Sequence, residues 1–142
     1  SLFLSPEVLE DNCHQLAAKY EQWHRDEVRH ETYNTDGDIE LLMVSYGTMS
    51  RICMTAIDEL KEQGRRVGLI RPVSLYPFPQ AAVAELCDRV DHVLCVEMSM
   101  GQMLEDVQRA AGRRKEVRFF GRTGGVVPSP DEVIDTIRKV LS

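Results

Sequence analysis

Short apolar runs and helix-spaced segments alternate four times along the 142-residue chain, and this alternation limits the possible folds more than any other feature. The apolar runs, which we predict to be strands, are residues 39–44, 67–70, 92–96 and 117–120. After each run, apolar residues recur at intervals of three and four, as on one face of a helix. Strands that alternate with helices form a mostly parallel sheet with helices on both faces, so we predict an α/β fold of this kind.

The segment before the first predicted strand has the pattern of a long amphipathic helix that runs from Ser5 to about Glu31. Ser5 is a good N-cap residue, and Pro6 suits the first position of a helix. One face carries an apolar stripe at helical spacing, formed by Leu9, Cys13, Leu16, Tyr20 and Trp23. We therefore divide the chain into a linking helix, residues 1–35, and an α/β domain, residues 36–142. The pattern leaves open whether this helix packs on its own domain or bridges to another one.

The composition limits the partners and the compartment. The chain carries a net charge of -6 and has a pI of about 5.2, whereas binding to nucleic acid requires a basic face. No apolar run approaches the roughly 20 residues of a membrane span. None of the cysteines belongs to a C-x-x-C pair, so neither a zinc site nor a disulfide framework is predicted for Cys13, Cys53, Cys87 and Cys95. We expect a cytoplasmic protein with reduced thiols, and neither nucleic acid nor a membrane as partner.

In such a sheet, every loop that leads from a parallel strand to a helix lies at the carboxyl ends of the strands, where ligands usually bind. Here these loops are residues 45–50, 71–79, 97–101 and 121–129. We regard them as a candidate ligand-binding or interface edge. The residues of this candidate edge are Tyr46, Gly47, Arg71, Tyr76, Phe78, Glu97, Gly101, Gln102, Gly124 and Gly125.

The loop at residues 71–79, RPVSLYPFP, is unusually stiff and is called the strap below. Pro72, Pro77 and Pro79 each fix their own φ and bias the preceding residue toward an extended conformation. A stiff, extended segment presents Tyr76 and Phe78 to a partner at a low entropic cost. The alternative, equally compatible with the sequence, is that both aromatic side chains belong to the local core.

No set of residues in the chain has the pattern of an active site. The loop after the first strand, SYGTMS, contains a single glycine, whereas dinucleotide binding requires G-x-G-x-x-G. His14, His24 and His30 are spaced by 10 and 6 residues and do not form the i, i+4 pair of a metal-binding helix. We predict no catalytic, cofactor-binding or metal-binding residue in this chain.

Two of the loops have more than one interpretation. Glu97 ends an apolar strand, where a carboxylate acts as a base, binds a partner cation or caps the next helix. Gly124 and Gly125 precede the last helix, where backbone N–H groups can hold an anion, but a simple mobile loop has the same composition. The last helix is predicted to start at a capping box formed by Ser129 and Glu132.

Two motifs of the chain match patterns that recur in one known enzyme family. The family's R-P-x-[ST]-L-[WY]-P-F-P strap is matched at Arg71, Pro72, Ser74, Leu75, Tyr76, Pro77, Phe78 and Pro79. Its E-x-[NS]-x-G-Q turn is matched at Glu97, Ser99, Gly101 and Gln102. By these motifs the chain resembles the 2-oxoacid:ferredoxin oxidoreductases. The likeness runs from about Ser5 to the end of the chain and is to the carboxyl-terminal part of the alpha subunit, called core domain II in the pyruvate enzyme. Within the family, the 2-oxoglutarate type is the most similar.

The resemblance implies a three-layer α/β/α sandwich, similar to the transketolase carboxyl-terminal domain, with four to five strands in the sheet. It implies a whole enzyme that oxidatively decarboxylates a 2-oxoacid to an acyl-CoA with thiamine diphosphate, Mg²⁺ and iron–sulfur clusters. It also implies partners: the rest of the alpha subunit, a beta subunit, ferredoxin and coenzyme A. No cofactor is expected in this chain, so we expect it to serve assembly and to be inactive alone.

Two other functions remain open at the level of the sequence. The chain is alternatively a transketolase-type domain of another thiamine enzyme, or a stand-alone regulatory domain that binds a small ligand. A thiamine-pyrimidine-type domain upstream of this segment would favour an enzyme domain over the regulatory one.

Overall fold

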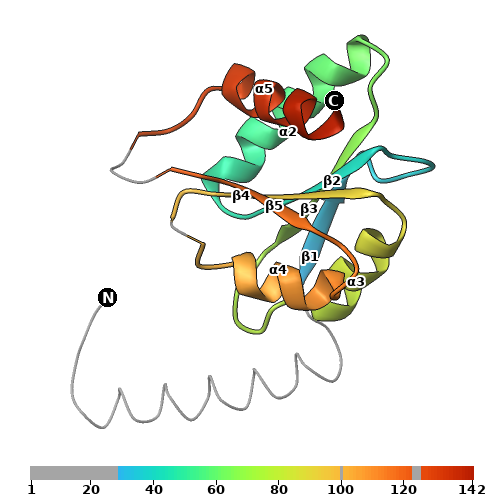
Figure 1. Cartoon of the computed structure of the whole chain (residues 1–142). Helices are drawn as coiled ribbons and strands as arrows, with labels where there is room; N and C mark the ends of the chain where they lie inside the picture. Colours follow the sequence, from blue (N-terminus) through green and yellow to red (C-terminus); the bar gives the residue numbers. More distant parts are fainter. Residues whose placement is uncertain (1–28, 100, 123–125) are drawn as a thin grey trace, which may run out of the picture.

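The computed structural model describes residues 29–99, 101–122 and 126–142, and in these residues five strands form a single sheet (Figure 1). The strands are β1 (His30–Tyr33), β2 (Leu41–Ser45), β3 (Val67–Pro72), β4 (His92–Glu97) and β5 (Val117–Gly121). Their order across the sheet is β1-β3-β2-β4-β5, with β1 antiparallel to β3 and the other strands parallel. The predicted mostly parallel sheet is confirmed.

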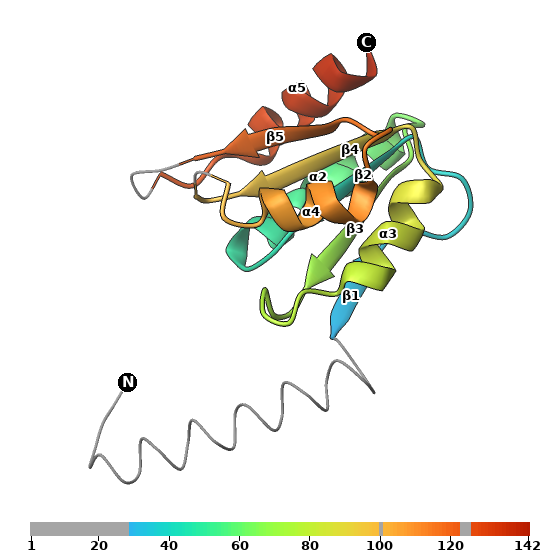
Figure 2. The ribbon, with the colours of Figure 1, turned by 60° about the horizontal axis from the view of Figure 1, so that its bottom comes forward.

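Helices cover both faces of this sheet. One face is covered by α2 (Thr48–Glu62) and α5 (Pro130–Leu141), and the other by α3 (Gln80–Asp88) and α4 (Leu104–Ala111), as the two views show (Figures 1 and 2). The three-layer α/β/α sandwich is therefore confirmed. None of the helices within the described ranges is long and apolar enough to cross a membrane.

The central strands are buried on both faces. Every residue of β2 is buried, and in β4 only His92 is partly exposed. Leu41 and Met43 belong to the core cluster under α2 and α5, whereas Leu42 and Val44 belong to the cluster under α3 and α4. Since successive residues of a strand point to opposite faces, a strand covered on both faces must be apolar throughout. This explains why the sequence shows continuous apolar runs here.

Strand β1 is the element that the sequence analysis missed. The helix predicted up to about Glu31 is wrong at its end, because β1 pairs with β3 and places Glu31 opposite Arg71. Its first three residues are exposed, so β1 has no apolar alternation to distinguish it from the end of a polar helix. These 4 residues of the predicted linking segment belong to the sheet. The rest of that helix prediction, residues 1–28, lies outside the described residues.

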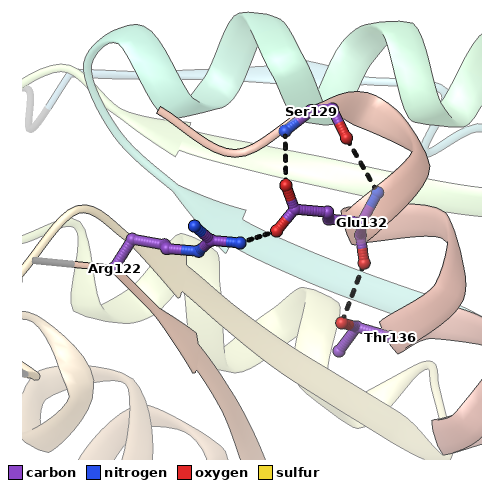
Figure 3. Close-up of polar contacts among 4 residues, drawn as sticks. All are labelled: Arg122, Ser129, Glu132 and Thr136. Carbon is purple, nitrogen blue, oxygen red and sulfur yellow. Dashed lines mark hydrogen bonds and ion pairs between the residues drawn. The ribbon is translucent and has the colours of Figure 1, made fainter. Parts of the chain in front are cut away.

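Helix α5 begins at the predicted capping box (Figure 3). Ser129 Oγ accepts a hydrogen bond from the backbone N–H of Glu132 at 3.3 Å, and the Glu132 carboxylate accepts one from the backbone N–H of Ser129 at 3.4 Å. The second oxygen of this carboxylate forms an ion pair with Arg122, which follows β5. The contact ties the end of β5 to the start of α5 and so holds both ends of the connecting loop.

Candidate functional site

The carboxyl ends of β2, β3, β4 and β5 lie along one edge of the sheet, because these strands are parallel. The structure thus brings the predicted loops to one side of the molecule. Gly124 and Gly125 lie outside the described residues, so the anion-binding interpretation of that loop stays a prediction.

Glu97, at the end of β4, is fully buried and organises the turn that follows it. Ser99 Oγ donates to Glu97 Oε1 at 2.7 Å, and the Met103 backbone N–H donates to both carboxylate oxygens at 3.1 Å. Met103 directly precedes α4, so the carboxylate satisfies an amide at the entry to that helix. The geometry supports the helix-capping interpretation of Glu97, because its oxygens are engaged within its own turn.

The turn after β4 also contacts the loop after β2. Tyr46 Oη donates to Gln102 Oε1 at 3.4 Å, a long hydrogen bond between two residues of the predicted edge. Gly47, next to Tyr46, has a φ of 63°, and its carbonyl accepts from Ser50 Oγ at 2.6 Å as α2 begins. Gly101 has a φ of 99°, in the region that favours glycine. Tyr46, Gly47, Gly101 and Gln102 therefore form one connected part of the edge.

The two aromatic side chains of the strap lie in different environments. Phe78 is only 9% exposed and packs in the core cluster under α3 and α4, whereas Tyr76 is 73% exposed. Ser74 Oγ donates to the Tyr76 carbonyl at 2.8 Å and accepts from its backbone N–H at 3.2 Å. The peptide bond between Tyr76 and Pro77 is cis. The core alternative thus holds for Phe78, and the interface hypothesis is left with Tyr76.

Arg71, the first residue of the strap, lies within β3 and contacts the neighbouring strand β1. Its Nη1 pairs with Glu31 of β1 at 3.0 Å, and its buried Nε has no hydrogen-bond partner in the described part of the chain. A cleft of about 100 Å³ lies here, and its walls include Tyr33, Met54 and Leu69. Because the sequence does not reveal β1, it could not predict this ion pair.

The contact between Arg122 and Glu132 is a further feature of the edge that the sequence analysis missed (Figure 3). Glu132 is recognisable as a capping residue, but nothing in the sequence shows that its second oxygen meets Arg122. The Arg122 backbone N–H also donates to the Glu97 carbonyl at 3.2 Å. The loop after β5 is therefore fixed at its base to both β4 and α5.

A family model described as pyruvate:ferredoxin oxidoreductase core domain II matches residues 39–133. The chain belongs to this family. The match begins just before β2 and ends within α5, so it covers the parallel part of the sheet and its helices. The resemblance inferred from the strap and the turn is thereby confirmed.

The relatives of this chain include subunits of enzymes that are named for two different 2-oxoacids. Ketoisovalerate oxidoreductase subunit VorB of Methanothermobacter thermautotrophicus is 40% identical over 140 residues, which are 99% of this chain and 39% of that protein. The 2-oxoglutarate synthase subunit KorA of Methanothermobacter marburgensis is 33% identical over 114 residues, which are 80% of this chain and 30% of that protein. The chain thus spans two fifths or less of these relatives' length.

Two solved structures share the fold of this core domain II chain. The 2-oxoglutarate:ferredoxin oxidoreductase from Magnetococcus marinus, with 2-oxoglutarate, coenzyme A and succinyl-CoA bound, matches 100% of this chain and 25% of that one. The TM-score is 0.77 at 16% identity. A split-gene transketolase, described as an inactive beta4 tetramer, matches 78% of this chain and 41% of that one with a TM-score of 0.65. Both likenesses concern the fold, which is the expected transketolase-like one.

The iron–sulfur clusters and the Mg²⁺ that the resemblance implies for a whole enzyme do not fit the side chains described here. Cluster ligands are thiolates, but burial raises the pKa of Cys53 to about 12 and that of Cys87 to about 11. Burial and the neighbouring Glu97 carboxylate also raise the pKa of Cys95 well above its usual value. In the described ranges, no group of three or more His, Cys, Asp and Glu side chains could hold a metal ion.

Proposed function

We propose that this chain is the carboxyl-terminal part of the alpha subunit of a thiamine-diphosphate-dependent 2-oxoacid:ferredoxin oxidoreductase, and that it serves domain and subunit assembly. The whole enzyme oxidatively decarboxylates a 2-oxoacid to an acyl-CoA in the cytoplasm and passes the electrons to ferredoxin. The family match and the identity to subunits of such enzymes support this proposal. Thiamine diphosphate, Mg²⁺, the clusters and coenzyme A are bound by the rest of the alpha subunit and by the beta subunit.

The observation that carries the assembly role is the exposure of one large aromatic side chain, Tyr76, on a restricted loop at the carboxyl edge. The Glu97 carboxylate binds its own turn, and Phe78 is buried in the core. Tyr76 stands 73% exposed on a strap whose backbone is restricted by prolines and by Ser74. Buried aromatics contribute strongly to interfaces, so Tyr76 is suited to bind a neighbouring domain or subunit.

One experiment tests the assembly role in the full-length alpha subunit, expressed with its beta subunit. Tyr76→Ala should weaken their association by about 2 kcal/mol, the loss typical of an interface hot spot. Tyr76→Phe, which keeps the ring, is the matched control and should associate nearly as well as the unchanged subunit. Equal association of all three proteins in sedimentation-velocity experiments would contradict the assembly role of the strap.

A second experiment tests the placement of the chemistry outside this chain. Isothermal calorimetry of the 142-residue chain with thiamine diphosphate and Mg²⁺ should show no binding. The described residues offer no metal-binding group to hold the Mg²⁺-diphosphate unit. Micromolar binding by the isolated chain would place part of the cofactor site here and overturn this part of the proposal.

A further inference from the structure

The segment between α4 and β5 is strongly basic, although the chain carries a net charge of -6. Five cationic side chains fall within residues 109–118: Arg109, Arg113, Arg114, Lys115 and Arg118. A hollow of about 650 Å³ lies here, and its walls include Arg109, Arg113, Lys115 and Glu116. We call this surface, from Arg109 to Arg118, the basic surface.

Lys115 connects the basic surface to the carboxyl end of α3 and the residues that follow it. Lys115 Nζ donates to the carbonyl oxygen of Cys87, in the last turn of α3, at 2.5 Å, and to that of Val90, which follows the helix. A cation at the carboxyl end of a helix interacts favourably with the helix dipole. These contacts restrict the loop at Lys115 before any partner binds, which lowers the entropic cost of binding.

The charges of the basic surface are only partly balanced within the described residues. Arg109 pairs with Asp106 at 3.1 Å, and Arg118 lies 3.4 Å from Glu116. Arg113 and Arg114 are exposed and have no ion pair in the described part of the chain. The guanidinium groups of these two successive residues therefore remain available for carboxylates or phosphates from outside the fold.

The geometry of the loop decides between classes of anionic partner. A phosphate site is usually a concave set of backbone N–H groups, but here the Gly112 N–H donates to the Gln108 carbonyl and the Lys115 N–H to the Gly112 carbonyl. Nucleic acid is disfavoured because the chain as a whole is acidic. A wide, open hollow whose walls include Arg109 and Arg113 suits a protein surface, since long cationic side chains make complementary contacts at interfaces.

We propose that the basic surface docks an acidic polypeptide segment rich in Asp and Glu, with Arg113 and Arg114 as its main contacts. The site lies at the amino end of β5. The strap and the Glu97 turn lie at the opposite edge, at the carboxyl ends of the strands. An acidic segment can therefore bind here while the carboxyl edge contacts other domains, so this docking is independent of the assembly role of Tyr76.

The test measures binding of a fluorescein-labelled decaglutamate peptide to the 142-residue chain by anisotropy at low ionic strength. The variant is Arg113→Ser combined with Arg114→Ser. The matched control is Arg51→Ser combined with Lys61→Ser, which removes the same charge from exposed positions of α2 on the other face of the sheet. We expect the variant to bind about fivefold more weakly, a loss typical of two exposed ion pairs, and the control to bind almost unchanged.

Three outcomes would overturn the proposal. The peptide does not bind, or the control weakens binding as much as the variant, in which case only the net charge matters. Alternatively, inorganic pyrophosphate displaces the peptide at a concentration at which a neutral salt of equal ionic strength does not, and the surface is then a phosphate site. A steep decrease of peptide affinity with added salt, restricted to the chain with Arg113 and Arg114 intact, supports the proposal.

Discussion

The strap and the Glu97 turn both leave carboxyl ends of parallel strands, yet they are held by different forces. The turn after β4 is organised around a buried carboxylate, which receives hydrogen bonds from Ser99 and Met103. The strap after β3 is restricted by prolines and anchored by Phe78, an apolar side chain in the core. One loop depends on polar groups being satisfied, and the other on packing and on limited backbone freedom.

The difference determines which groups each loop can offer to a partner. In the turn, the strongest polar group faces inward and is engaged within the loop. In the strap, anchoring by Phe78 leaves Tyr76 projecting outward, at 73% exposure. A loop held by packing at one position can thus present a large side chain at another without losing its conformation. Four substitutions or titrations test this contrast.

The largest expected effect comes from removing the anchor of the strap. Phe78→Ala should lower the free energy of unfolding by about 3–5 kcal/mol, the usual cost of deleting a buried phenyl ring. Urea unfolding followed by circular dichroism measures this change. Phe78→Leu, which refills most of the volume, is the control and should lose much less. A small loss for Phe78→Ala would mean that the prolines and the Ser74 hydrogen bonds hold the strap without Phe78.

The second expected effect comes from removing the carboxylate that holds the turn. Glu97→Ala leaves the buried Met103 N–H without its acceptor, so the free energy of unfolding should fall by about 2–3 kcal/mol. Glu97→Gln keeps one oxygen acceptor and should cost about 1 kcal/mol. Hydrogen exchange of the Met103 amide gives a local measurement. If that amide stays equally protected in Glu97→Ala, the turn is not held by the carboxylate.

The fold could be predicted because one sequence pattern, an apolar run followed by a helix-spaced segment, occurs four times along the chain. Each parallel strand stands out as a short apolar run, and each following helix shows one apolar face. The four predicted strands accordingly lie within two residues of the observed bounds of β2 to β5. Strand β1 was missed because an exposed edge strand of 4 residues carries neither signal. The antiparallel pairing of β1 with β3 is a long-range contact that leaves no trace in local spacing.

The sequence identifies residues of the candidate edge, but it does not show the role of each residue. Parallel topology places the loops of Tyr46 and Gln102 at one edge, as predicted. Their contact follows from β2 lying next to β4, an order that the sequence analysis did not predict. Whether an aromatic beside proline points inward or outward depends on the exact path of the strap, so Phe78 and Tyr76 could not be told apart. The interface role of the edge stays a prediction.

The free energy of unfolding should depend on pH through Cys87, which lies in the same core cluster as Phe78 of the strap. Burial raises the pKa of Cys87 from 9.0 to about 11, against the opposing charge of Lys115. The folded protein therefore keeps this proton where the unfolded chain loses it. The stabilisation is complete below pH 9 and is lost as the pH rises toward 11.

The free energy of unfolding should accordingly fall by about 1 kcal/mol per pH unit in this window because of Cys87. Urea unfolding at several alkaline pH values gives the slope, and Cys87→Ala should show a shallower one. Other groups also titrate at alkaline pH, so the comparison between the two proteins isolates the Cys87 thiol. Identical slopes would show that this thiol does not stay protonated on folding.

The smallest expected effect comes from Tyr76, and it is the sharpest test of the contrast within the strap. Tyr76→Ala should change the free energy of unfolding by less than about 0.5 kcal/mol, as for most surface substitutions. Its side chain is 73% exposed, and the hydrogen bonds with Ser74 involve its backbone, which the substitution keeps. Tyr76→Phe separates the hydroxyl from the ring. If Tyr76→Ala destabilises the chain as much as Phe78→Ala, both aromatics anchor the strap, and Tyr76 does not serve an interface alone.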